Sequence, residues 1–579
     1  MNATADSACR EAPLLPALLH RRATEHGARV ALRFLRRGEH LADQASYADL
    51  DAAARIAAAN LLSAGLARRP VLLALPQGLD FVRCFLGCLY AGAIAVPTPA
   101  LADPRGAERI AAIAAQAQPA ALIATPDHIA AGETLVTLRA AAPAIRALAP
   151  ADVLAGPALA SPAGAGADAI AFLQYTSGST SRPKGIVITH GNIAANLAMI
   201  RAAFAQDEGN STVSWLPLHH DMGLIGCVLE PLSLGAEAVL MSPLAFLQKP
   251  LRWLRALAAY GATTAGAPNF GYELCARAVD EAAARTLDLS RWRLAFCGSE
   301  PVRATTLARF AARFAPSGFA AEAFYPCYGL AEATLFVTGG APGSGVRERA
   351  LPRPAGGEIR AVSCGAPRGG AAIALLRQDV PEHVAPGAIG EIAVAGPQLS
   401  PGFWDAARGI VPDAAREVRL DGQRFLRTGD LGALQDGGLH VVGRLKDMII
   451  VRGANIFAED VEQTVLAHPA AAALGAVAAL ALADIASDST ASEGLILACE
   501  AARGVAPARP AEMLAALATV VAQAHGVLPT EIVLLPAGGI ERTLSGKLQR
   551  ARTRERLAQG ALPILARFAA PRPAPRPAA

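Results

Sequence analysis

The chain has 579 residues, of which 53% are hydrophobic, 18% charged and 5% aromatic, and its formal net charge is 53 − 49 = +4. A charge this close to balance over this length excludes a protein held on nucleic acid by a basic face. The length is enough for several units of about 150 residues, with cores that need no disulfide or metal support.

Signals for targeting, membrane insertion and metal binding are weak. The first 15 residues lack a basic segment followed by a clean apolar one, so no signal peptide is predicted. The longest stretch of weakly hydrophobic residues, 470–483, is mostly Ala. It is shorter than the ~20 residues of a membrane-spanning helix. The nine cysteines are scattered and form no CxxC pair or His/Cys cluster, which favours reduced buried thiols. We expect a cytoplasmic protein with no integral membrane segment and no nucleic-acid partner.

Short β-rich runs alternate with Ala- and Leu-rich segments of helical period from residue 71 onward. This alternation predicts an α/β fold with parallel strands and crossover helices. The stretch 155–167, rich in Ala, Gly, Pro and Ser, is expected to be a surface linker. The β-rich runs are residues 71–75, 95–99, 121–125 and 170–176.

The C-terminal part is less regular. Residues 339–370 are dense in Gly, Pro and Arg and predict an irregular excursion. Two β runs in 438–453 flank the charged segment 444–447, and a helix is expected after them, with Glu459 and Asp460 near its start, where negative charge suits the helix dipole. The last residues are a Pro-rich tail with nothing to bury.

A loop rich in hydroxyl groups lies between two predicted strands. An apolar run ending at Tyr175 leads into the six hydroxyl or glycine residues 176–181, which Pro183, Lys184 and Gly185 close before a second β run. In such a loop several backbone N–H groups can point at one bound anion. Lys184 adds a compact positive charge suited to phosphate oxygens. It is not a Walker A loop, because the lysine precedes a glycine with no Ser or Thr after it. The pattern favours a phosphate-binding loop over a flexible turn.

The stretch YTSGSTSRPKG resembles the phosphate loop of the adenylate-forming superfamily, and in its details the fatty acyl-AMP ligases. The resemblance extends from about residue 15 to about residue 560. It implies a large N-terminal domain of stacked sheets, flanking helices and a small distorted barrel-like subdomain, and a small mobile α+β C-terminal domain. The implied bounds are 1–443 for the first domain, 444–447 for a hinge, 448–568 for the second domain and 569–579 for a disordered tail.

The segment WLPLHHDMGLIG, residues 215–226, interrupts an apolar run with two imidazoles and a carboxylate. Its residues alone fit a satisfied core cluster or a cavity lining, because buried polar groups need partners. By resemblance His220 positions the reacting carboxylate. Amino-acid-activating relatives have an Asp near this position that holds the α-amino group, so Asp221 keeps an amino-acid substrate open as an alternative. The MGLIG that follows departs from the pattern of those relatives and argues against it. The implied acyl-pocket residues are Trp215, His220, Met222, Gly223, Leu224, Ile225 and Ala267.

Nucleotide contacts are also implied by resemblance. In the YGLAEAT motif Tyr328 would stack on adenine, Glu332 would hold Mg²⁺ together with Thr180, and Thr334 would reach the α-phosphate. Asp430 of the RTGD motif would bind the ribose hydroxyls, with Arg444 as a second contact. The full set of implied nucleotide-binding residues is Thr176, Ser177, Gly178, Ser179, Thr180, Lys184, Gly298, Ser299, Glu300, Tyr328, Gly329, Leu330, Ala331, Thr334, Asp430, Arg444 and Lys547.

The stretch RTLSGKLQR near the C-terminus matches the family's PRTxSGKxQR motif, with Glu541 in place of the usual proline. By resemblance Lys547 is the catalytic residue between the carboxylate and the α-phosphate, with His220 and Glu332 as its catalytic partners. The C-terminal domain would pivot at Lys446. The implied reaction uses ATP and Mg²⁺ to convert a fatty acid into an acyl-adenylate and pyrophosphate.

The acyl acceptor divides the superfamily. The ligase-like motifs imply transfer to the phosphopantetheine thiol of an acyl carrier protein, or of a carrier domain of a polyketide or peptide synthetase. The family's insertion after YGLAEAT is shorter here, which leaves coenzyme A open as the acceptor. Amino-acid adenylation and a non-catalytic nucleotide-binding homologue are further alternatives, and chain length and oligomeric state are not predicted.

Overall fold

The computed structural model describes residues 13–101, 104–130, 133–175, 183–352, 358–378, 380–451, 454–482, 494–505, 507–542 and 548–569. The chain divides into two compact units. Unit 1 comprises residues 1–351, 360–428 and 432–441, and unit 2 comprises residues 352–359, 429–431 and 442–579. Each unit has hydrophobic clusters of its own.

A nine-stranded sheet forms one layer of unit 1. Its central strands are parallel, and the three pairings at its ends, two at one end and one at the other, are antiparallel. This confirms the predicted parallel arrangement with crossover helices. In spatial order the strands are β17 (Ala366–Pro367), β14 (Phe336–Gly339), β13 (Phe324–Gly329), β12 (Leu294–Cys297), β11 (Thr264–Ala267), β9 (Ser211–Ser214), β10 (Glu237–Met241), β1 (Val30–Arg36) and β2 (His40–Ser46).

An eight-stranded sheet contains the β-rich runs recognised in the sequence. Its parallel part joins β7, β4, β3, β5 and β6, and β8 and β20 extend it with antiparallel pairings. The order is β21 (Gly409–Val411), β20 (Phe403–Asp405), β8 (Gly185–Thr189), β7 (Ile170–Tyr175), β4 (Ile94–Pro97), β3 (Pro70–Leu73), β5 (Ala121–Ile123) and β6 (Arg146–Leu148).

A third, five-stranded sheet completes the mixed α/β architecture. It consists of β18 (Ala372–Leu376), β19 (Gly390–Ala395), β23 (Gln423–Gln435), β22 (Glu417–Leu420) and β24 (Gly438–Arg444). The prediction of an irregular segment over residues 339–370 is wrong in part. The short strands β15 (Glu348–Pro352) and β16 (Glu358–Val362) pair there, because strand pairing can form without a long periodic pattern.

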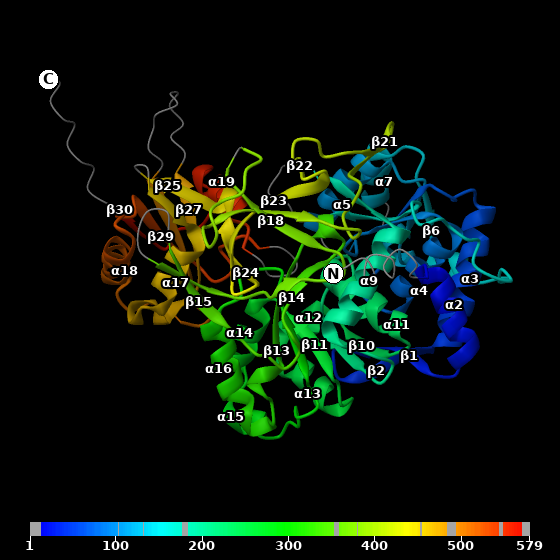
Figure 1. Ribbon diagram of the computed structural model, residues 1–579, viewed down its shortest axis with the longest axis horizontal. Helices are drawn as coiled ribbons and strands as arrows, with labels where there is room; N and C mark the ends of the chain where they lie inside the picture. Colours follow the sequence, from blue (N-terminus) through cyan, green and yellow to red (C-terminus); the bar gives the residue numbers. More distant parts are fainter. Residues whose placement is uncertain are drawn as a thin grey trace. The chain divides into compact units, whose positions relative to one another are not determined.

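Helices pack between and beside the sheets of unit 1. Helices α3 (Tyr47–Ser63) and α4 (Leu79–Ala91) approach closely because Gly87 has no Cβ, and a Cβ there would lie 2.3 Å from that of Ala57. Helices α14 (Asn269–Ala278) and α16 (Ala304–Phe314) lie side by side (Figure 1). The other longer helices are α2 (Leu15–His26), α5 (Pro104–Ala117), α7 (Glu133–Ala141), α9 (His190–Phe204) and α13 (Leu251–Ala259).

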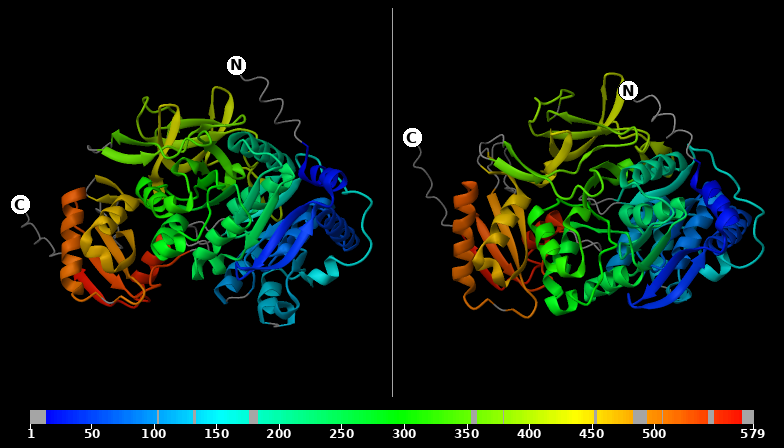
Figure 2. Two further views of the ribbon diagram at one scale, coloured as in Figure 1. Left: turned by 90° about the horizontal axis from the view of Figure 1, so that it is seen from below. Right: turned by 60° about the horizontal axis from the view of Figure 1, so that its bottom comes forward.

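Unit 2 is built on a four-stranded sheet with apolar side chains on both faces. The strands are β27 (Leu474–Leu482), β28 (Gly494–Ala501), β29 (Glu531–Leu535) and β30 (Ala566–Ala569). Helices α17 (Ala458–Ala467) and α18 (Pro510–His525) pack on it, and α18 is the orange helix beside the sheet in Figure 2. The hairpin of β25 (Met448–Val451) and β26 (Ala454–Phe457) precedes α17. Helix α17 has Glu459 and Asp460 in its first turn, as the sequence predicted.

No helix in the described part of the chain is both long enough and apolar enough to cross a membrane.

Candidate active site

The loop predicted to bind phosphate starts where β7 ends. Residues Thr176, Ser177, Gly178, Ser179 and Thr180 lie outside the described residues, so their roles stay predictions. The structure does describe the residues on both sides of this loop, up to 175 and from 183 onward.

Gln174 lies at the first end of the loop and Lys184 at the second. The side-chain amide of Gln174 donates from Nε2 to the carbonyl of His219 at 2.9 Å, which ties β7 to the His-His-Asp segment. Lys184 is exposed, and its Nζ lies 5.0 Å from the centroid of the Phe403 ring. Phe403 is held there because it pairs with Ile186 across β20 and β8.

The His-His-Asp segment leads into the short helix α10 (Asp221–Leu224). His220 Nδ1 lies 2.6 Å from Asp221 Oδ1, which also accepts the backbone N–H of Met222 at 2.7 Å. This fixes the orientation of the imidazole and leaves its Nε2 for another contact. Burial, helped by the charges of His220 and Arg109, lowers the pKa of His219 to about 3, so His219 is neutral near pH 7. Sequence reasoning singled out His220 and gave no role to its neighbour.

Gly223 is required by the turn at this segment. A Cβ on Gly223 would lie 2.3 Å from the carbonyl oxygen of Pro217, closer than atoms can approach. After α10 the chain continues as one π-helical turn, Ile225–Leu229, a feature often found at functional sites.

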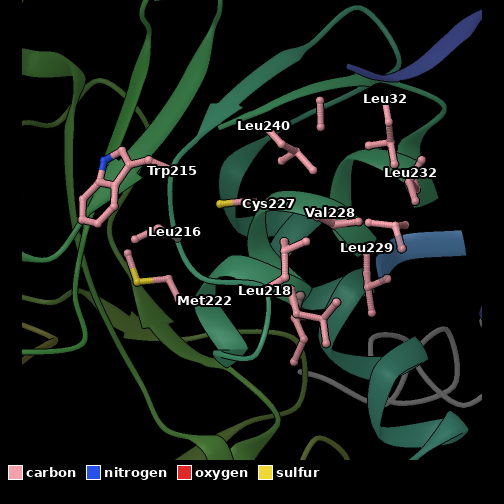
Figure 3. Close-up of a cluster of buried hydrophobic side chains, with 14 of the residues drawn as sticks. Leu32, Trp215, Leu216, Leu218, Met222, Cys227, Val228, Leu229, Leu232 and Leu240 are labelled. Carbon is pink, nitrogen blue, oxygen red and sulfur yellow. The ribbon is translucent and has the colours of Figure 1, made fainter. Parts of the chain in front are cut away.

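Apart from the partly exposed His220, the residues predicted to line the acyl pocket are buried. Trp215, Met222, Leu224, Ile225 and Ala267 are each 5% exposed or less. Trp215 stacks on Phe246 with 3.9 Å between ring centroids. Figure 3 shows Leu216 and Met222 near the ring of Trp215, and Leu218 on the side toward Val228 and Leu229. The structure brings these residues into one apolar cluster.

One contact joins the acyl segment to the turn predicted to flank adenine. The hydroxyl of Ser299 lies 3.3 Å from the Sδ of Met222. Ser299 lies in the turn after β12. Its φ of +69° is an uncommon conformation for a residue other than glycine. Glu300 accepts the backbone N–H of Phe270 at 2.6 Å, and a Cβ on Gly298 would lie 3.0 Å from the carbonyl oxygen of Cys327. The predicted adenine and acyl residues are therefore neighbours.

The YGLAEAT motif forms a tight excursion between β13 and β14. Tyr328 pairs with Thr338 and is 8% exposed, while Leu330 and Ala331 follow in the turn. Gly329 has no room for a side chain, because a Cβ would lie 1.8 Å from the carbonyl oxygen of Leu335.

Thr334 ends the short 3₁₀ turn of the motif. It is fully buried, and its hydroxyl donates to the carbonyl of Gln398 at 2.7 Å. Its predicted contact with the α-phosphate would need this hydroxyl to exchange partners.

Glu332, the predicted magnesium ligand, forms an ion pair. Its Oε1 lies 3.0 Å from Nη1 of Arg416, whose guanidinium carbon lies 5.7 Å from the centroid of the Phe403 ring. Phe403 therefore contacts both Arg416 and Lys184. Sequence reasoning missed Arg416 and Phe403, because neither lies in a recognised motif and only strand pairing brings them to Glu332.

Mg²⁺ suits an oxygen donor such as Glu332, with phosphate oxygens and water as the remaining ligands. Among the described residues no group of three or more His, Cys, Asp or Glu side chains could hold a metal by itself. A single partly exposed carboxylate is the donor set expected for a cation that arrives with a nucleotide.

Four further predicted residues belong to unit 2. Asp430 is 6% exposed and pairs with Arg444, with 2.8 Å between Oδ1 and Nε. Lys446 is exposed on a short 3₁₀ turn, Leu445–Asp447. Lys547 lies outside the described residues, so its role stays a prediction.

Comparison with known proteins places the chain in a family. Residues 19–404 match the AMP-binding enzyme family. A medium-chain fatty acid–acyl carrier protein ligase of Moorena producens is 34% identical over 572 residues, 94% of this chain and 95% of the relative. The chain is a fatty acyl-AMP ligase of the AMP-binding enzyme family.

Solved structures agree with this assignment. A fatty acyl-adenylate ligase from work on the E. coli and L. pneumophila enzymes aligns with a TM-score of 0.83 and 33% identity, covering 95% of this chain and 98% of the other. The L. pneumophila fatty acyl-adenylate ligase in complex with acyl adenylate and pyrophosphate aligns with a TM-score of 0.69 and 32% identity, covering 97% and 99%. The ligase fold expected from the sequence is confirmed.

Proposed function

We propose that this fatty acyl-AMP ligase uses ATP to activate a fatty acid as its acyl-adenylate and then transfers the acyl group to the phosphopantetheine thiol of an acyl carrier protein. The observation that carries the proposal is the contact between Ser299 and Met222, since it joins the residues expected beside adenine to those expected along the acyl chain. A carboxylate in the apolar cluster would then lie next to the α-phosphate. The carrier-protein ligase of Moorena producens supports the acceptor.

In the first step a carboxylate oxygen attacks the α-phosphorus, a P–O bond forms, and pyrophosphate leaves with its electron pair. The enzyme needs no nucleophile of its own, so its task is positioning and charge stabilisation. His220, held by Asp221 at Nδ1, would orient the carboxylate through Nε2. Lys547 would place its ammonium between the carboxylate and the α-phosphate.

The phosphate loop and Lys184 would hold the departing pyrophosphate. Glu332 and Thr180 would hold Mg²⁺, which when bound neutralises charge on the phosphate oxygens. Tyr328 would stack on adenine, and Asp430 with Arg444 would bind the ribose. Apolar residues around Trp215 would exclude water from the mixed anhydride.

In the second step the thiol sulfur attacks the acyl carbon and a thioester forms. The bond from the acyl carbon to the phosphate oxygen breaks, AMP leaves with its electron pair, and the thiol proton is released. We propose that the C-terminal domain turns at Lys446, within residues 444–447, so that one orientation serves adenylation and the other serves transfer. Lys547 would then act in the first step only.

The proposal is tested by substrate-dependent pyrophosphate release. Fatty acids of graded length are compared with the 20 amino acids at saturating ATP and Mg²⁺, and we expect release with fatty acids alone. Release with amino acids alone would identify an amino-acid-activating enzyme, and release with neither would leave a nucleotide-binding homologue.

The acceptor requires a second assay. The preformed acyl-adenylate is offered coenzyme A, a holo carrier protein, and the same carrier protein without its phosphopantetheine as the matched control. We expect thioester on the holo carrier protein only. An equal or faster yield of acyl-coenzyme A would contradict the carrier-protein proposal and indicate a coenzyme A ligase.

A further inference from the structure

Arg416 lies at the predicted pyrophosphate end of the site without belonging to any recognised motif. It precedes β22 in unit 1, and its guanidinium and the ammonium of Lys184 both contact the ring of Phe403, at 5.7 and 5.0 Å from the ring centroid. Two cations that share one aromatic ring repel each other, and the negative face of the ring offsets this only in part. A polyanion that contacts both cations would offset that repulsion.

The position of this pair is fixed by the backbone. Phe403 pairs with Ile186, two residues after Lys184, so the ring stays with the end of the phosphate loop. The backbone N–H of Arg427 donates to the carbonyl of Arg416 at 2.8 Å, and that of Ser400 donates to the carbonyl of Glu332 at 2.8 Å. Lys184, Phe403, Arg416 and Glu332 are therefore held together before any ligand arrives.

Arg416 keeps donors for a ligand. Its Nη1 donates to Glu332 at 3.0 Å and its Nε to Asp413, and within the described part of the chain nothing accepts from Nη2. Its side chain is 31% exposed. A guanidinium carries five N–H donors in a planar fork that matches phosphate oxygens.

We propose that Arg416 binds the β- and γ-phosphates of ATP, and hence the departing pyrophosphate, together with Lys184. The inference rests on the proposed function, because it needs ATP as the ligand and Glu332 beside the bound Mg²⁺. Once Glu332 turns to the cation, a phosphate oxygen replaces it as the partner of Arg416. Asp413 keeps the guanidinium in place during this exchange.

The test measures binding rather than turnover. Dissociation constants of Mg²⁺-ATP, Mg²⁺-pyrophosphate and AMP are measured by isothermal titration calorimetry for the wild type, Arg416→Ala and Arg416→Lys. We expect Arg416→Ala to weaken ATP and pyrophosphate about 10- to 100-fold, the range for a lost charge-assisted hydrogen bond, and to leave AMP within about twofold. Arg416→Lys should recover part of the loss, because it keeps the charge without the fork.

Arg419→Ala is the matched control, since Arg419 is an exposed arginine of the same strand region, and its Nη1 donates to the carbonyl of Gly422. It should bind all three ligands as the wild type does. Thermal melting shows whether each variant is folded. If Arg416→Ala does not fold, Arg416→Gln takes its place, because the glutamine amide can still contact Asp413.

Equal loss of AMP and ATP affinity would overturn the proposal and make Arg416 a structural residue, and unchanged ATP affinity would also overturn it. These outcomes are separable from failure of the proposed function. If the wild type binds ATP but releases no pyrophosphate on addition of fatty acid, the proposed function is contradicted. The affinities of the Arg416 variants for the three ligands are measured without turnover, so they test the role of Arg416 separately.

Discussion

Arg550 forms an ion pair with the buried Glu462, with 2.8 Å between Nε of Arg550 and Oε1 of Glu462. Arg550 also pairs with Asp447 and Glu459, so one guanidinium joins the start of α19 (Arg550–Ala558) to the predicted hinge and to α17. These carboxylates raise the pKa of Arg550 despite its burial, which by itself lowers it. Arg550 follows the predicted catalytic lysine by three positions, so this network anchors one end of its loop.

Removing Arg550 should destabilise unit 2 and disturb adenylation. Arg550→Ala removes the partner of the buried Glu462 and of the partly buried Glu459 and Asp447, and we expect a loss of about 3–5 kcal/mol in the free energy of unfolding. Denaturant unfolding measures it. Arg554→Ala, on the exposed side of the same helix, should change stability by less than about 0.5 kcal/mol. Equal effects of the two substitutions would contradict a structural role for the network.

Replacing Lys547 should abolish adenylation while leaving ATP bound. Loss of one preorganised positive charge at the reacting phosphate is expected to lower the rate of pyrophosphate release about 10²- to 10³-fold. The chain has only four lysines, Lys184, Lys249, Lys446 and Lys547. Lys249→Ala, at an exposed position after α12 (Pro243–Gln248), is therefore the natural control. Pyrophosphate release at the wild-type rate from Lys547→Ala would refute its catalytic role.

Glu230 should make stability depend on pH. It is 1% exposed, and burial, opposed by the charge of Arg201, raises its pKa from 4.5 to about 8. A raised folded-state pKa means that its contribution is full below about pH 4.5 and is lost as pH rises through 8. Glu230→Gln should flatten this decline and gain about 2–4 kcal/mol over the wild type above pH 8.

Melting temperatures from pH 5 to 9 measure this effect. Glu25→Gln, at an exposed position in α2, should leave the pH profile unchanged. Parallel profiles for the wild type and Glu230→Gln would show that Glu230 does not titrate in this range.

Gly329 should tolerate no side chain. Because a Cβ there would meet the carbonyl oxygen of Leu335 at 1.8 Å, Gly329→Ala must displace backbone between β13 and β14. We expect a cost of about 2–4 kcal/mol and weaker ATP binding, since Tyr328 precedes the displaced segment. At Gly340 a Cβ would meet only the hydroxyl oxygen of Ser344 at 3.3 Å, so Gly340→Ala is the control and should be nearly neutral. A fully stable Gly329→Ala with normal ATP affinity would contradict this account.

Much of the site could be predicted from the sequence because its motifs are local. The strand that ends at Tyr175, the strand that starts at Gly185 and the helix that begins beside Glu459 each follow from the residues of one short segment. The family resemblance added roles for residues such as Glu332 and Asp430. Strands within residues 339–370 were missed, since their pairing depends on partners rather than on periodicity.

The α/β class, the order of the motifs and the kind of chemistry follow from local patterns in the sequence, because hydrophobic period and loop composition act over a few residues. The contacts between distant side chains, in contrast, are set by how the strands and helices pack. Glu332 and Arg416 are 84 positions apart, and Lys184 reaches Phe403 through the pairing of β8 with β20. Such contacts depend on strand register and crossover geometry, which no local pattern encodes.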